Sequence, residues 1–185
     1  FKALGRDVTI KKKDKRNFGK VESAFLKDTT EVYDLTFQTE KSLKIKIEVD
    51  TRPPLGFDTE QKLQLQPFSV MVRCFTLPAL LAGKMHALVF RGWKNRVKGR
   101  DWYDFEWYVR QGIGLDYTHL QERIYELNGI EMGYGKFIET LKAKILSTNI
   151  EQVKADVLPF VLDQSEIAIW STAYFLQLVD MIKLA

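Results

Sequence analysis

The chain has 185 residues, 45% hydrophobic and 12% aromatic, which suits one folded domain or two small ones sharing a core and excludes a disordered chain. The net charge is +4, and the single cysteine, Cys74, excludes an intramolecular disulfide and a cysteine-based zinc site. No apolar run approaches the roughly 20 residues needed to span a bilayer and no signal-peptide pattern is present, so we expect a cytoplasmic protein.

The N-terminal segment is basic and predicts an exposed strand. Residues 1–20 hold eight Lys or Arg and two Asp, a net charge of +6. Within them, Asp7–Asp14 has the lysine-rich composition of a strand at the edge of a sheet. The opening residues Phe1–Gly5 read as the tail of a helix closed by a glycine. We therefore expect that a natural N-terminal portion precedes them.

The order of the remaining elements predicts an α+β fold. Further strands are expected at Val32–Phe37, Leu43–Asp50 and Phe68–Phe75, and the apolar period changes to that of helices after residue 76. We therefore expect a mixed sheet domain over residues 1–76, followed by a C-terminal helical bundle over residues 77–185. The expected helices are Leu77–Arg91, Arg100–Gln111, Asp116–Leu127, Tyr134–Leu146, Ile150–Asp156 and Glu166–Lys183.

The strand Leu43–Asp50 alternates strictly between apolar and charged residues, so its charged residues share one face. Glu48 and Asp50 would then lie about 7 Å apart along that face. Carboxylates on a strand can hold Mg²⁺, because hard cations bind several oxygen ligands. The alternative is an ordinary solvent-facing side of an antiparallel strand, on which Lys and Glu are surface residues.

The first expected helix carries a lysine within its apolar stripe. On a helical wheel Lys84 lies near the centre of this stripe, and Arg91 lies close beside it. An ammonium group there must reach out to water, pair with a carboxylate or bind a ligand, and the last two readings both stay open. Residues 84–100 hold six Lys or Arg and no acid, a net charge of +6. Two such basic blocks favour a local site for phosphates or RNA.

The second expected helix carries two acids that we expect to point inward. On the wheel Asp101 and Asp104 flank the apolar side, whereas Glu106 faces away. An acid in the first turn is also favoured by the helix dipole, which would explain Asp101 without any function. Because inward charges rarely go unpaired, Lys84 and Arg91 are the expected partners of these two acids.

Four segments, taken in order and spacing, resemble the AbiEii/AbiGii toxin family, and the resemblance covers roughly residues 1–125. The last two segments carry most of its specificity. The segments are Val21–Lys27 (VESAFLK), Leu43–Arg52 (LKIKIEVDTR), Leu77–Arg91 (LPALLAGKMHALVFR) and Lys98–Phe105 (KGRDWYDF).

The resemblance implies a nucleotidyltransferase-like sheet that transfers a nucleotide from an NTP with Mg²⁺, often as the toxin of a toxin–antitoxin or phage-defence pair with a cognate antitoxin. Relatives are implied to modify tRNA ends, which makes tRNA one candidate acceptor. By position, the resemblance implies catalytic roles for Lys84, Asp101 and Asp104, nucleotide binding by Lys46, Arg91 and Arg100, and metal binding by Glu48 and Asp50.

The chain departs from the family at the family's first motif, a Gly-Gly/Ser turn followed by an Asp-x-Asp pair. Residues 1–40 contain no such pair. We therefore expect that motif upstream of Phe1, and we expect residues 1–185 alone to be inactive in nucleotide transfer. Two alternatives stay open. One is a non-catalytic RNA- or antitoxin-binding protein that keeps the fold, and the other is a housekeeping nucleotidyltransferase without a toxin role.

Overall fold

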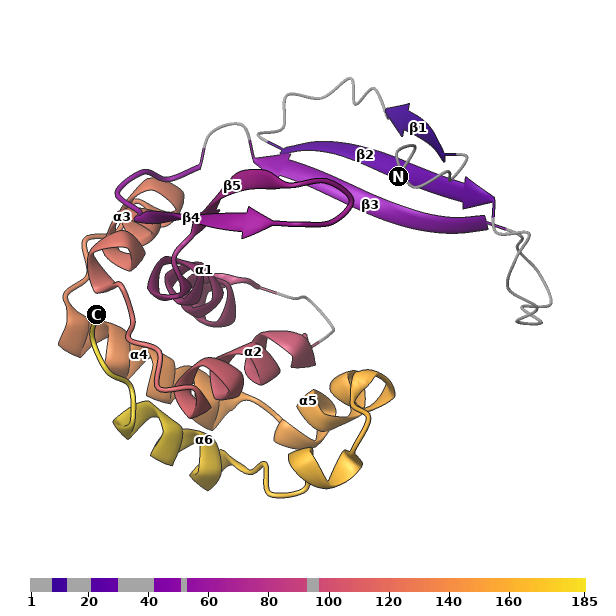
Figure 1. The fold of residues 1–185 in the computed structure, drawn as a ribbon. Coiled ribbons are helices and arrows are strands. Elements are labelled where there is room, and N and C mark those ends of the chain that lie inside the picture. Colours follow the sequence, from indigo (N-terminus) through magenta and orange to yellow (C-terminus); the bar gives the residue numbers. More distant parts are fainter. Residues whose placement is uncertain (1–7, 13–20, 30–41, 51–52, 93–96) are drawn as a thin grey trace. The chain divides into compact units, whose positions relative to one another are not determined.

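The computed structural model of the chain divides into two compact units (Figure 1). The first comprises Phe1–Pro53 with Lys62–Val72, and the second comprises Pro54–Gln61 with Arg73–Ala185. The division at residue 76 that we expect from the sequence stays a proposal. The structure describes residues 8–12, 21–29, 42–50, 53–92 and 97–185, and for residues 8–12, 21–29 and 42–49 it describes the backbone alone.

The first unit contains a three-stranded antiparallel sheet in the order β1-β2-β3. Strands β1 (Val8–Lys12) and β3 (Ser42–Asp50) lie where strands are expected from the sequence. Strand β2 (Val21–Thr29) is not expected, because its sequence VESAFLKDT lacks a clean alternation of apolar and polar residues. The expected strand Val32–Phe37 lies outside the described residues.

A hairpin of β4 (Thr59–Gln64) and β5 (Val70–Phe75) forms a separate two-stranded sheet. Strand β5 falls within the segment predicted to be a strand, Phe68–Phe75. Strand β4 is not predicted, because its sequence TEQKLQ has a single large apolar residue and no apolar face to reveal it. The described strands followed by helices confirm the α+β class.

In the described residues, six α-helices make up most of the second unit, and the first five lie within one or two residues of the predicted bounds. None of the helices in the described residues is both long enough and apolar enough to cross a membrane. The helices are α1 (Leu77–Phe90), α2 (Gly99–Arg110), α3 (Tyr117–Asn128), α4 (Tyr134–Ser147), α5 (Ile150–Val157) and α6 (Thr172–Asp180).

The predicted last helix, Glu166–Lys183, is wrong in its first part. A short 3-10 turn occupies Gln164–Ile167, and α6 begins only at Thr172. Ser171 adopts an extended backbone conformation, and its side chain accepts a hydrogen bond from the backbone N–H of Tyr174. A serine that caps a helix in this way marks the helix start, so a continuous helix cannot run through it.

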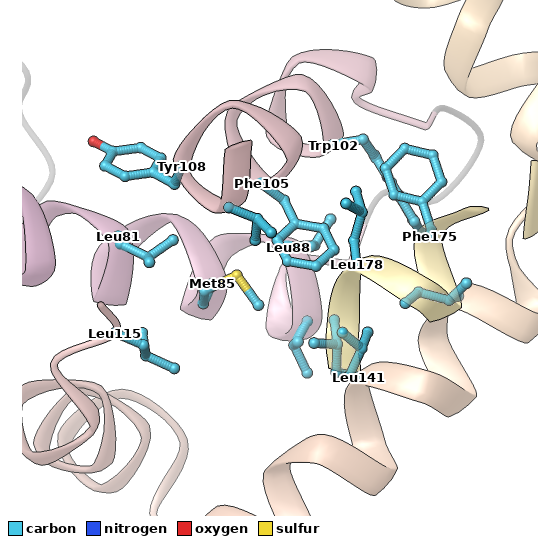
Figure 2. Packing of buried hydrophobic residues seen from close by; sticks show 14 of the residues in the cluster. Leu81, Met85, Leu88, Trp102, Phe105, Tyr108, Leu115, Leu141, Phe175 and Leu178 are labelled. Atoms are coloured by element: carbon cyan, nitrogen blue, oxygen red, sulfur yellow. The ribbon is translucent and has the colours of Figure 1, made fainter. Parts of the chain in front are cut away.

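The core of the second unit lies among the helices, where apolar side chains meet in one cluster (Figure 2). Trp102 of α2 contacts the ring of Phe175 of α6 edge to face, with the ring centroids 4.9 Å apart. Each fully buried side chain of this size stabilises the fold by about 1.5–3 kcal/mol. The central residues are Leu81, Met85 and Leu88 of α1, Trp102 and Phe105 of α2, Leu141 of α4, and Phe175 and Leu178 of α6.

Glu106 is buried, so the expectation that it faces away from the core is wrong. Its carboxylate accepts hydrogen bonds from the indole N–H of Trp170, at 3.0 Å, and from the hydroxyl of Tyr174, at 2.6 Å. The helical wheel assumes that one face of a helix is covered. Helix α2 instead packs against α1, α5 and α6, so most of its circumference is enclosed.

Candidate functional site

Two ion pairs join α1 to α2 and involve four residues that the sequence singles out. The Lys84 ammonium lies 2.7 Å from a carboxylate oxygen of Asp104, and the Arg91 guanidinium lies 3.8 Å from one of Asp101. Lys84 lies on α1 and Arg91 directly follows the end of this helix in an extended conformation, while the two acids are one turn apart on α2. The expectation that these cations meet these acids is therefore confirmed.

The burial of the two pairs differs. The side chains of Lys84 and Asp104 are 40% and 28% exposed, whereas those of Arg91 and Asp101 are 44% and 7% exposed. The Lys84 side chain is thus partly exposed, although the wheel places its residue near the centre of the apolar stripe. A lysine stem can cover apolar surface while its charged end extends beyond it, and here that end meets the carboxylate of Asp104. Asp101 is the buried charge of this group.

A pocket of about 290 Å³ opens beside the Arg91–Asp101 pair. Arg91 and Asp101 line it together with Lys98 at the N-terminal end of α2 and Lys144 near the end of α4. The turn Ser147–Asn149 closes the pocket on the side of α5. We name this feature the basic pocket. Sequence reasoning missed Lys144 as a site residue, because nothing in its own helix signals that a segment more than 40 residues away contributes to the same cavity.

Positive charge accumulates around the basic pocket. Burial lowers the pKa of the Lys98 ammonium below its ordinary value, and the nearby cation of Arg100 lowers it further. Asp101 raises this pKa, whereas Arg91 and Lys84 lower it. Three other cationic side chains thus lie close enough to act on the Lys98 ammonium. Such a concentration of positive charge attracts anions such as phosphates.

The acids of β3 belong to the first compact unit. Asp50, the last residue of the strand, is exposed, while the side chains of Lys46 and Glu48 lie outside the described residues. Glu48 is aligned with Ser23 of β2, and Asp50 with Val21. Within the part of the chain that the structure describes, no three His, Cys, Asp or Glu residues come together as a metal-binding group.

The start of α2 is fixed by a close approach of α5 to Gly99. The backbone N–H of Gly99 donates a hydrogen bond to a carboxylate oxygen of Asp156, at 2.9 Å. A Cβ atom at position 99 would lie 2.5 Å from the carbonyl oxygen of Val153 and 3.1 Å from the backbone nitrogen of Val157. Only a residue without a side chain fits there, because backbone atoms cannot rotate out of the way.

We expect Gly99→Ala to lower the free energy of unfolding by about 1–3 kcal/mol, since α2 and α5 must move apart to admit the methyl group. Urea denaturation of the purified chain measures this. The matched control is Gly135→Ala in α4, where an added Cβ meets nothing within 4 Å. It should leave stability unchanged or raise it, because alanine favours the helix. Equal stability of the Gly99→Ala variant and the unaltered chain would contradict the close approach.

Comparison with known proteins gives one match. A family model described as "Nucleotidyl transferase AbiEii toxin, Type IV TA system" matches residues 2–177. No curated protein and no solved structure matches the chain. The match includes both ion pairs and every residue that lines the basic pocket.

Proposed function

Because the chain belongs to the AbiEii family of nucleotidyl transferase toxins, we propose that it serves the transfer of a nucleotide from an NTP to an acceptor. In this reaction the acceptor oxygen bonds to the α-phosphorus and pyrophosphate leaves. The main support for the proposal is the two ion pairs, Lys84–Asp104 and Arg91–Asp101, that link α1 and its C-terminal end to α2. They place two cations, each paired with a carboxylate of α2, on α1 and at its C-terminal end. Cations fixed in this way bind and neutralise phosphates.

The proposal gives each of these residues a role. Lys84 and Arg91 contact the phosphates of the nucleotide, Arg91 in a bidentate manner where geometry allows. Asp104 and Asp101 position these cations before the nucleotide arrives, at the distances of 2.7 and 3.8 Å already given. Lys46 and Arg100 add positive charge for the nucleotide. Arg100 is exposed at the start of α2, which leaves its guanidinium accessible to a ligand.

Magnesium fits the chemistry of β3, because Glu48 and Asp50 supply the oxygen ligands that this cation prefers. Two carboxylates do not complete its coordination. We propose that they hold Mg²⁺ together with phosphate oxygens and the family's Asp-x-Asp pair, which the printed sequence does not contain. When bound, the cation would neutralise charge on the phosphates. We accordingly propose that the 185 residues alone do not transfer nucleotides.

Membership of the family also supports proposals about the acceptor of the nucleotide and about the biological role of the protein. We propose an RNA acceptor of the tRNA type, consistent with the two basic blocks at residues 1–20 and 84–100. We also propose that the protein acts as the toxin of a toxin–antitoxin pair with a cognate antitoxin, in a setting such as phage defence.

We expect Glu48→Gln to lower nucleotide transfer by more than about tenfold in the protein that contains this chain, because the amide is a weaker ligand for a hard cation. Incorporation of labelled nucleotide into RNA measures the transfer, and thermal denaturation should show a nearly unchanged melting temperature. Glu22→Gln is the control. Glu22 of β2 is aligned with Val49, the residue after Glu48, so it does not occupy the same register position as Glu48. Full activity with lowered stability would show that Glu48 is merely structural.

A further inference from the structure

The residues that line the basic pocket include three cations and one acid. Arg91, Lys98 and Lys144 line it with a single acid, Asp101. Among the described residues, the ammonium of Lys144 has no ion-pair partner. Lys142, two positions earlier in the same helix, does pair with Asp180, at 2.8 Å. An ammonium left beside a cavity can bind an anion at little cost, because no existing pair must break.

The lining of the basic pocket also carries uncharged donors and acceptors. Asn149 uses its side-chain oxygen to accept hydrogen bonds from the backbone N–H groups of Glu151 and Gln152, so its amide NH₂ remains available in the described part of the chain. The hydroxyls of Ser147 and Thr148 donate to the carbonyl oxygen of Lys144, at 3.0 and 2.7 Å, so their oxygens can still accept. Sugar hydroxyls and base edges offer the complementary groups.

The size of the cavity further limits the kinds of ligand that can bind in it. A volume of about 290 Å³ lies at the lower end of the range for small-molecule sites, roughly 300–1,000 Å³. One nucleotide unit fits this scale, whereas a folded partner or a long polymer does not enter it. The combination of cations with amide and hydroxyl groups in one cavity suits a ligand that carries both a charged group and uncharged polar groups.

We propose that the basic pocket binds one phosphorylated nucleoside, with its phosphate on Arg91, Lys98 and Lys144 and its sugar or base against Asn149 and the Ser147–Thr148 turn. This inference rests on the proposed function through Arg91, and it extends the site to residues of α4 and α5. The nucleoside is either a free NTP or the terminal nucleotide of an RNA strand, since both present the same chemistry.

Binding to the purified 185-residue chain tests the proposal. The probes are each of the four NTPs in turn, without metal, and a short single-stranded RNA. We expect Lys144→Ala and Asn149→Asp each to weaken binding by about tenfold, the scale of one charge-assisted contact. Aspartate caps a helix as well as asparagine does, so the second variant keeps the start of α5 intact. Lys142→Ala is the matched control and should bind as the unaltered chain does.

The two probes separate the sources of the nucleoside. Weaker NTP binding by both variants assigns the pocket to the incoming nucleotide, and weaker RNA binding assigns it to the acceptor. The proposal is overturned if the unaltered chain binds neither probe, or if Lys144→Ala binds both as tightly as Lys142→Ala. Either negative result leaves the proposed function to be judged on Glu48→Gln in the transfer assay, which tests the carboxylates of β3.

Discussion

Lys84→Met should lower nucleotide transfer by about a hundredfold or more in the protein that contains this chain, because it removes a fixed cation from charge that develops on the phosphates. Stability should change by less than about 1 kcal/mol, since the Lys84–Asp104 pair is partly exposed and such pairs contribute little. The methionine side chain also fills the apolar stripe that the lysine stem now covers. Thermal denaturation with and without Mg²⁺ and NTP should show that the nucleotide no longer raises the melting temperature.

A matched lysine gives this experiment its control. Lys142 is also 40% exposed and pairs with Asp180 at 2.8 Å, so it resembles Lys84 in both burial and geometry. Lys142→Met should therefore cost the same small stability and leave transfer unchanged. If Lys84→Met also transfers and binds nucleotide normally, the pair is a structural link between α1 and α2 and nothing more.

Glu106→Ala should lower the free energy of unfolding by about 3 kcal/mol, the largest loss of stability that we expect from a single polar side chain here. The substitution leaves the Trp170 indole N–H and the Tyr174 hydroxyl without their acceptor inside the helical unit. It also leaves a cavity beside them. Urea denaturation measures the loss. Glu139→Ala is the control, because the Glu139 side chain is 71% exposed and should contribute almost nothing.

The hydrogen bond between Tyr174 and Glu106 should also make the stability of the protein depend on pH at high pH. Burial, the hydrogen bond to Glu106 and the charge of Glu106 together raise the pKa of the Tyr174 hydroxyl from 10.0 to about 12, although the nearby Arg110 lowers it. The unfolded chain therefore loses this proton at lower pH than the folded chain does. Stability should fall as the pH rises from about 10 to about 12. Glu106→Ala should weaken this dependence, and an unchanged pH profile would show that the carboxylate does not act on Tyr174.

Local patterns in the sequence predict helices and strands well where an element packs a single apolar face against the rest of the protein. The alternation in Leu43–Asp50 identifies β3, and the helical period locates α1 to α5 to within one or two residues. The pairing of Lys84 and Arg91 with acids of α2 is also predictable, since charges that point inward need partners.

Tertiary context decides the features that local patterns miss. Glu106 lies away from the apolar side of α2 on a helical wheel, but Trp170 and Tyr174 bond to it and help to bury it, and no pattern within α2 predicts this. The cationic side of the basic pocket joins Lys144 to Arg91 and Lys98 only because α4 ends beside the junction of α1 and α2. The space at Gly99 is likewise set by the backbone of a helix some 50 residues downstream.

Helix α5, whose backbone lies against Gly99, has only eight residues. A helix this short depends on its packing to stay folded, here through Ile150, Val153 and Val157. Its first turn also supplies Asn149 and Gln152 to the basic pocket. Local opening of α5 would therefore dismantle the pocket, and a ligand that binds only the closed form must suppress that opening. Amide hydrogen exchange in α5 should slow with ligand concentration, while exchange in α3, which contributes nothing to the pocket, should not change.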